Sequence, residues 1–215
     1  MMLHEKYRPR SLADIVGHEK TVQRLRQLIS RPGYSGGALW IDGPSGTGKT
    51  TLARCLANEL GASDWDTVEL DGDKCDVQAV RDLERDILKS GGMFGGSGWR
   101  VWIVNEAHAM TTRAVQAWLT LLERLPGKRL IVFTTTQGRK ADLFGDFSDP
   151  LMSRCLVFSL SSYGLKEAFA ERAKAIAESE GLDGQPIAKY QRLVADSKNN
   201  LRAVLSAIEA GEMIQ

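Results

Sequence analysis

The sequence has few cysteines, no long apolar run and no apolar leader, and each absence excludes a class of protein. Cys55, Cys75 and Cys155 lie too far apart in sequence for a disulfide framework or a C-x-x-C zinc site, so we expect a reduced, cytoplasmic protein. No apolar run approaches the roughly 20 residues that cross a bilayer, so we expect no membrane association. The opening Met-Met-Leu-His-Glu-Lys lacks the apolar core of a signal peptide, so we expect no export.

The sequence also lacks an excess of charge of either sign. It has 28 lysines and arginines against 27 aspartates and glutamates, a net charge of +1. A protein that binds DNA through a broad basic face usually carries a larger excess, so any DNA contact must come from local arrangement. The hydrophobic share of 43% and charged share of 26% are typical of a globular protein, and 215 residues suffice for one domain or two small ones.

Short apolar runs alternate with helical periodicity through the first 160 residues. The runs predict five strands, at 38–41, 67–70, 101–104, 130–133 and 156–158, of which the first is expected to be buried. Amphipathic spacing predicts helices at 19–30, about 49–60, 77–88 and 114–125. Continuous apolar strands separated by amphipathic helices indicate an α/β fold, a five-stranded parallel sheet covered by helices on both faces.

The pattern changes after residue 160. Residues 163–180, about 186–196 and about 199–210 have helical patterns with no strand between them. We therefore predict a boundary near Ser161 and Ser162, with an α/β nucleotide-binding domain at 1–160 and a small all-helical lid domain at 161–215.

A phosphate-binding motif lies between the first predicted strand and the next helix. It fits G-x-x-x-x-G-K-[ST] and consists of Gly43, Pro44, Ser45, Gly46, Thr47, Gly48, Lys49 and Thr50. Its glycines let successive backbone N–H groups point at phosphate oxygens in front of a helix N-terminus. Lys49 is expected to reach the β- and γ-phosphates of ATP and the Thr50 hydroxyl to ligate Mg²⁺. We add Thr51, the next residue, to the expected nucleotide-binding set.

An acidic position follows the third predicted strand. Glu106 is placed to polarise the water that attacks the phosphate. The position before it, where such motifs carry an aspartate, is Asn105. Its amide can hydrogen-bond a metal-bound water but adds no negative charge. Because loss of an outer-shell partner costs roughly 10–100-fold in metal affinity or activity, we expect weakened Mg²⁺ handling. The alternative is that both residues only cap the following turn.

With these motifs in place, the chain resembles the AAA+ ATPases that load sliding clamps for DNA polymerases, such as replication factor C small subunits. The resemblance extends from Glu5 to about Ile208. It includes the opening segment (residues 5–18), Glu69-Leu70-Asp71-Gly72, and the run from Leu121 to Pro126. In that family the opening segment folds over the adenine. The resemblance therefore implies that Tyr7, Arg8, Pro9 and Val16 border the base.

The triplet Ser153-Arg154-Cys155 resembles the clamp-loader motif whose arginine reaches the nucleotide of a neighbouring subunit. The resemblance implies that Arg154 is an arginine finger, a group worth about 10³–10⁵ in rate because it neutralises charge on the transferred phosphoryl group. The alternative is an ordinary surface arginine before a strand.

Two sensor residues are implied by the same resemblance. Thr135, at the end of the fourth predicted strand, is the candidate for a polar residue near the γ-phosphate, although the register could equally select Thr134 or Thr136. Arg202, in the segment Asn199-Asn200-Leu201-Arg202, is expected to approach the phosphates from the lid. The alternative for Arg202 is a solvated helix face.

Three departures separate the chain from the family pattern. Asn105 replaces an aspartate, no cysteine cluster for zinc interrupts the core, and we expect no helical collar domain after the lid. Assembly into the same ring is therefore open. We expect an ATPase with neighbouring AAA+ subunits as partners and a sliding clamp as the target.

Two other functions are left open by the sequence. One is a collarless AAA+ remodeller for helicase loading or branch migration, and the other is a nucleotide-binding scaffold with weak hydrolysis. DNA contact is a further hypothesis, which would use Lys74, Arg81, Lys89 and Arg113. The competing interpretation is that these four are solvated helical charges.

Overall fold

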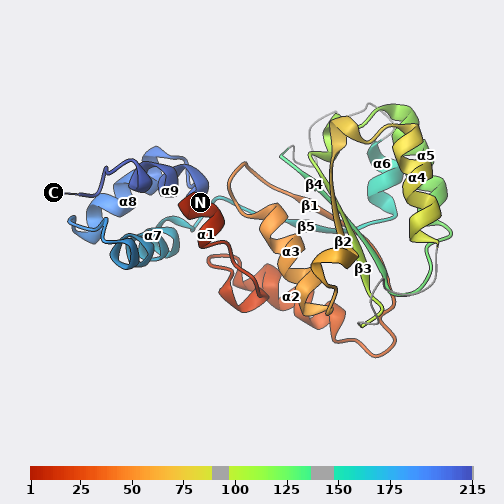
Figure 1. Ribbon diagram of the computed structural model, residues 1–215, viewed down its shortest axis with the longest axis horizontal. Coiled ribbons are helices and arrows are strands. Elements are labelled where there is room, and N and C mark those ends of the chain that lie inside the picture. Colours follow the sequence, from red (N-terminus) through yellow and green to blue (C-terminus); the bar gives the residue numbers. More distant parts are fainter. Residues whose placement is uncertain (89–96, 137–147, 215) are drawn as a thin grey trace.

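The protein is built on one five-stranded sheet in which every neighbouring pair is parallel (Figure 1). The computed structural model describes residues 1–88, 97–136 and 148–214. The strand order is β2-β3-β4-β1-β5. The strands are β1 (Gly36–Asp42), β2 (Thr67–Asp71), β3 (Arg100–Asn105), β4 (Arg129–Thr135) and β5 (Leu156–Ser159). The predicted five-stranded parallel sheet is confirmed.

Helices connect the strands and form the C-terminal part. Those of the core are α2 (Glu19–Ile29), α3 (Lys49–Glu59), α4 (Val77–Ile87), α5 (Thr112–Leu122) and α6 (Ser148–Ser153). The remaining helices are α1 (Leu3–Lys6), α7 (Lys166–Glu180), α8 (Ile187–Asp196) and α9 (Leu201–Glu209). Within the described part of the chain, no helix is both long and apolar enough to cross a membrane.

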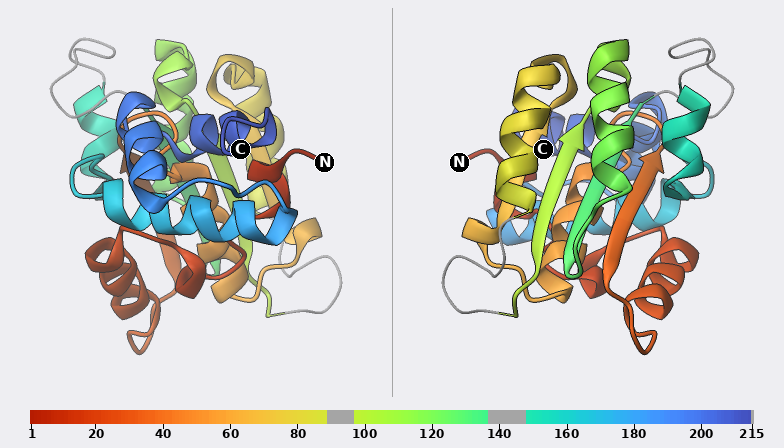
Figure 2. Two further views of the ribbon diagram at one scale, coloured as in Figure 1. Left: turned by 90° about the vertical axis from the view of Figure 1, so that its left-hand side faces the viewer. Right: turned by 90° about the vertical axis from the view of Figure 1, so that its right-hand side faces the viewer.

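Two apolar clusters cover the two faces of the sheet, because side chains alternate between faces along a strand. On β1, Leu39 and Ile41 face α2 and α3, whereas Ala38 and Trp40 face the side of α4 and α5. Figure 2 shows the strands between these two groups of helices. Burial of the three central strands β1, β3 and β4 on both faces explains their apolar sequences.

Helices α7, α8 and α9, here called the lid, form a separate unit at one end of the molecule, with its own apolar cluster (Figure 1). Leu3 of α1 belongs to that cluster and is 4% exposed, although the predicted division puts residues 1–160 in the core. The segment after α1 then returns to the core. The division at residues 160 and 161 therefore stays a prediction, and α1 packs as part of the lid.

Two helix ends differ from the predicted ones by three residues. The first lid helix begins at Lys166 rather than 163, because Gly164 has a φ of +78° and interrupts helical backbone. Helix α5 ends at Leu122 rather than 125, ahead of Pro126 and Gly127. The short helices α1 and α6 escape prediction, since four and six residues are too few to show a helical period.

Candidate nucleotide-binding site

The loop after β1 has the backbone of a phosphate cradle. Gly43, Gly46 and Gly48 have φ angles of +149°, +76° and +93°, which side-chain-bearing residues rarely adopt. The loop leads directly into α3, which begins at Lys49. Backbone N–H groups and the N-terminus of a helix of 11 residues therefore face the same space, an arrangement that favours anions.

Lys49 lies inside this loop. It is 6% exposed, and its Nζ donates to the carbonyl oxygens of Gly43 at 2.8 Å and Pro44 at 3.0 Å. Burial lowers the pKa of Lys49, while Glu106 acts in the opposite direction and Arg202 in the same one. Among the described residues no carboxylate lies within salt-bridge distance of Lys49. A buried cation whose described hydrogen-bond partners are carbonyl groups fits a phosphate ligand.

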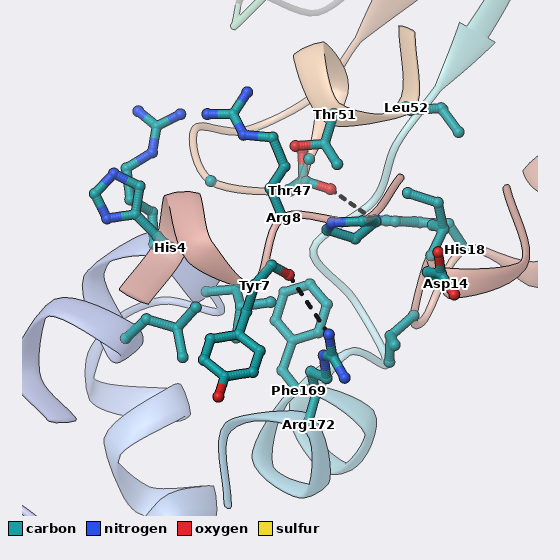
Figure 3. Close-up of a pocket in the computed structure, with 18 of the residues that line it drawn as sticks. His4, Tyr7, Arg8, Asp14, His18, Thr47, Thr51, Leu52, Phe169 and Arg172 are labelled. Carbon is teal, nitrogen blue, oxygen red and sulfur yellow. Dashed lines mark hydrogen bonds between the residues drawn. The ribbon is translucent and has the colours of Figure 1, made fainter. Parts of the chain in front are cut away.

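A pocket beside the loop lies between the core and the lid (Figure 3). The opening segment supplies Tyr7, Arg8, Pro9 and Val16, the four residues expected to border the base. Six further lining residues have aliphatic or aromatic side chains: Ile15, Leu52, Phe169, Ile176, Leu201 and Leu205. A mostly apolar slot with phosphate donors at one end fits the base, sugar and phosphates of a nucleotide.

The core residues of this pocket include one group that the sequence analysis did not single out, His18. It is 8% exposed, and its Nε2 lies 3.0 Å from the Thr47 carbonyl oxygen. Burial lowers the pKa of His18, and the contact with Thr47 opposes this shift. The sequence offers no signal for His18 beyond its place at the end of the opening motif.

The lid residues that close the pocket also escaped the sequence analysis. Phe169 and Arg172 line it, and the guanidinium of Arg172 donates to the Tyr7 carbonyl at 3.5 Å (Figure 3). Asn200 lies so close to the loop that a Cβ added at Gly46 would come within 1.9 Å of its Oδ1. Phe169 has the periodicity of a lid core residue, and Asn200 belongs to the segment that contains Arg202.

The side of the site where Mg²⁺ is expected is organised around Asn105. Its Oδ1 accepts hydrogen bonds from the hydroxyls of Thr50 at 2.7 Å and Thr134 at 3.0 Å. No group of three or more His, Cys, Asp or Glu side chains in the described ranges could hold a metal ion. The Thr50 hydroxyl with Asn105 beside it fits Mg²⁺, which in phosphate sites takes few protein ligands and completes its shell with phosphate oxygens and water.

Glu106 follows β3 in an unusual backbone conformation. Its φ is +49°, and a Cβ at Gly72 would come within 2.4 Å of the Glu106 carbonyl oxygen, so a glycine is needed at residue 72. The exposed Glu106 carboxylate accepts a hydrogen bond from Thr136 at 3.0 Å and lies 3.4 Å from His108 Nδ1. Glu106 lines a hollow together with Thr50, Asn105 and Arg202.

The three threonines at the end of β4 point in different directions. The hydroxyl of Thr134 donates to Asn105 Oδ1, as that of Thr50 does, whereas the hydroxyl of Thr135 lies 3.0 Å from His108 Nδ1. Thr135 is fully buried, and its carbonyl accepts the backbone N–H of Gly43. The role of Thr135 as the sensor therefore stays a prediction, and Thr134 is the threonine whose hydroxyl shares an acceptor with Thr50.

Arg202 and Arg154 lie at opposite ends of the strands of the sheet. Arg202 is exposed and lines both the pocket and the hollow beside Glu106, at the carboxyl ends of the strands, here called the nucleotide edge. Arg154 is exposed, pairs with Glu123 at 2.8 Å, and lines a hollow with Gly36 and Gly37 at the amino ends, here called the finger edge.

Three of the four charges considered for DNA contact lie on the surface of the protein. Lys74, Arg81 and Arg113 are exposed, and Lys74 pairs with Asp71 at 2.8 Å. Lys89 lies outside the described residues. The hypothesis of DNA contact stays untested.

Comparison with known proteins agrees with this arrangement. A family model described as an AAA ATPase domain matches residues 14–207. The chain belongs to the AAA ATPase family. The match includes the phosphate loop, β3 and most of the lid of this AAA ATPase, and it confirms the predicted family and fold.

Curated relatives of this AAA ATPase are replication factor C small subunits. That of Halobacterium salinarum is 32% identical over 209 residues, which are 96% of this chain and 61% of the relative. That of Natronomonas pharaonis is 34% identical over 216 residues, with 98% and 62% covered. The chain thus spans about three fifths of the length of these relatives.

Solved structures similar to this AAA ATPase include the RuvB Holliday junction branch migration motor of Thermotoga maritima. The TM-score is 0.70 at 20% identity, covering 94% of this chain and 64% of that one. A mutant form of the same RuvB protein gives a TM-score of 0.74 at 19% identity, with 95% and 65% covered. At this identity the likeness shows the fold alone.

Proposed function

We propose that this AAA ATPase binds ATP between its core and lid and hydrolyses it at a site completed by a neighbouring subunit. The observation that carries the proposal is the separation of two parts of one site. The phosphate loop with buried Lys49 lies at the nucleotide edge, whereas Arg154 lies at the finger edge.

The phosphate loop, Lys49 and Arg202 would hold the phosphates, and the apolar pocket would take the base. Mg²⁺, when bound, would neutralise phosphate charge, with the Thr50 hydroxyl as its ligand and Asn105 behind it. Glu106 would orient the attacking water, and its contact with Thr136 holds the carboxylate near the site.

Strand geometry supports action between subunits. Arg154 shares its hollow with Gly37, six residues before Gly43 on the path of β1. At about 3.3 Å per residue these positions are about 20 Å apart, farther than an arginine side chain extends. Arg154 therefore cannot serve the phosphate loop of its own chain without a large rearrangement, but it can serve that of a neighbour.

Clamp loading is the cellular role that the relatives support best. Replication factor C small subunits are 32–34% identical to this chain, whereas the RuvB motor is 20% identical. We therefore propose a sliding clamp as the target, with ATP-dependent opening of the clamp as the work done. A pulldown with mass spectrometry, together with native mass measurement in ATP, would test this role, and repeated recovery of another remodelling target without a clamp would contradict it.

A mixing experiment tests the interface. A Glu106→Gln subunit cannot orient water but can donate Arg154, whereas an Arg154→Ala subunit has an intact pocket but no finger. Neither alone should hydrolyse ATP at an appreciable rate, and mixing the two should restore activity. Arg192→Ala, which changes an exposed lid arginine paired with Asp196, is the matched control and should behave like the parent. If mixtures show only the sum of the two separate activities, the site does not act between subunits.

A further inference from the structure

Asn105 occupies the place of an expected carboxylate, and the structure shows a carboxylate directly behind it. The Asn105 Nδ2 donates a hydrogen bond to Glu69 Oε1 at 2.9 Å, while its Oδ1 accepts from Thr50 and Thr134. Since an ionised carboxylate only accepts hydrogen bonds, the amide must turn its nitrogen toward Glu69. That orientation directs the amide oxygen at the hydroxyl expected to ligate Mg²⁺.

Glu69 reaches this position from the neighbouring strand. Strand β2 pairs with β3 in parallel, and Glu69 lies opposite Ile103, two residues before Asn105. Glu69 lines the same hollow as Thr50, Asn105 and Glu106. Its second oxygen pairs with Arg54. The carboxylate therefore contacts a cation on one side and the Asn105 amide on the other.

We propose that Glu69 is a positioning residue that supplies the missing negative charge of the metal site through Asn105. The inference rests on the proposed function, because it concerns Mg²⁺ held with ATP. Glu69 fixes the orientation of the Asn105 amide and polarises it, so that Oδ1 becomes a stronger acceptor for the Thr50 hydroxyl. In the usual motif one aspartate both accepts the hydrogen bond of this hydroxyl and carries the negative charge. Here Asn105 on β3 accepts the hydrogen bond and Glu69 on β2 carries the charge.

Arg54 makes it possible to test whether Mg²⁺ affinity depends on the sign of the charge that is removed. Glu69→Gln and Arg54→Gln break the same ion pair, but the first removes a negative charge near the metal and the second a positive one. If Glu69 acts through its charge, Glu69→Gln weakens Mg²⁺ affinity about 10–100-fold, as loss of an outer-shell partner does. Arg54→Gln should tighten it about two- to fivefold, the scale of an exposed ion pair. If the pair only supports the fold, both variants weaken Mg²⁺ binding.

The measurement is binding of a fluorescent ATP analogue by the full chain, titrated with Mg²⁺, with circular dichroism melting as the folding check. Glu69→Asp, which keeps the charge, should keep more of the Mg²⁺ affinity than Glu69→Gln. If the parent binds no nucleotide with or without Mg²⁺, the proposed function and this inference both fail. If the parent binds and Glu69→Gln has the Mg²⁺ dependence of the parent, only the inference fails.

A charge exchange gives a second, independent outcome. Asn105→Asp alone would place a carboxylate against Glu69, at the 2.9 Å now occupied by a hydrogen bond, so it should not improve Mg²⁺ affinity. Asn105→Asp combined with Glu69→Gln moves the charge to residue 105 and provides a donor at residue 69, so that the hydrogen bond between the two side chains runs in the reverse direction. The double variant should bind Mg²⁺ at least as tightly as the parent. Tighter binding by Asn105→Asp alone, with no gain in the double variant, would overturn the inference.

Discussion

The nucleotide edge and the finger edge contribute different numbers of groups to the proposed reaction. At the nucleotide edge the chain brings together a phosphate loop, an apolar pocket and the carboxylate of Glu106 from its own residues. At the finger edge it presents one arginine whose described partners are Glu123 and the Pro150 carbonyl. On the proposed function, a single chain can bind nucleotide, whereas hydrolysis requires a second chain. Four changes test this division, from the largest expected effect to the smallest.

The largest effect should come from Arg154→Ala at the finger edge. Hydrolysis in the assembled protein should fall by about 10³–10⁵, because charge on the transferred phosphoryl group loses its neutralising partner. ATP affinity of the isolated chain should be unchanged. Steady-state phosphate release and equilibrium binding measure the two quantities, and equal losses in both would show that the two edges are not separate.

At the nucleotide edge, Lys49→Ala should weaken ATP binding by about 10–100-fold, the value of a hydrogen bond to a charged group. The folded state should not suffer in the same way, because Lys49 is a buried cation without a described carboxylate partner. Calorimetric titration measures the affinity and thermal melting the stability. Unchanged affinity would remove Lys49 from the site.

The contact between lid and loop gives a smaller effect, on stability. Gly46→Ala places a Cβ 1.9 Å from Asn200 Oδ1 at a φ of +76°, so it combines backbone strain with a clash. Gly33→Ala is the matched control, since its φ is +80° and nothing lies within 4 Å of the added carbon. Strain alone should cost about 1–2 kcal/mol in either variant. Gly46→Ala should lose more than that and bind ATP less well, and equal losses would contradict the close approach of Asn200 to the loop.

The smallest effect concerns pH. Burial lowers the pKa of His18 below the unfolded value near 6.5, so the unfolded state binds more protons below that pH. The contribution of His18 to stability should fall on acidification below about pH 6.5, by no more than about 1.4 kcal/mol per pH unit. His18→Gln should flatten this part of a stability profile from denaturant unfolding. A steeper profile in the variant would reverse the assigned direction.

Local chemistry explains why the nucleotide edge is largely predictable from sequence. The phosphate loop is a contiguous motif, and its strand and helix have uninterrupted patterns. The opening segment is placed by resemblance, and Tyr7, Arg8, Pro9 and Val16 do line the pocket. The parallel sheet follows from apolar runs because both of its faces are buried.

The parts that escape prediction depend on distant pairs. Glu69 and Asn105 are 36 residues apart in sequence, and neither reveals the other. The orientation of Thr134 and Thr135 depends on where a strand ends, which a run of three threonines does not specify. Arg172 reaches the pocket, and Asn200 reaches Gly46 of the phosphate loop, only because the lid folds back on the core.

The packing of α1 against the lid has a mechanical consequence. Leu3 is buried among lid residues, and both Lys6 and Tyr7 hydrogen-bond Glu180 of α7. The lid is thus tethered to the core twice, by the chain entering α2 and by the chain leaving β5. Two tethers restrict a rigid body to rocking about the line between them, so nucleotide-driven motion of the lid should have one principal axis rather than many.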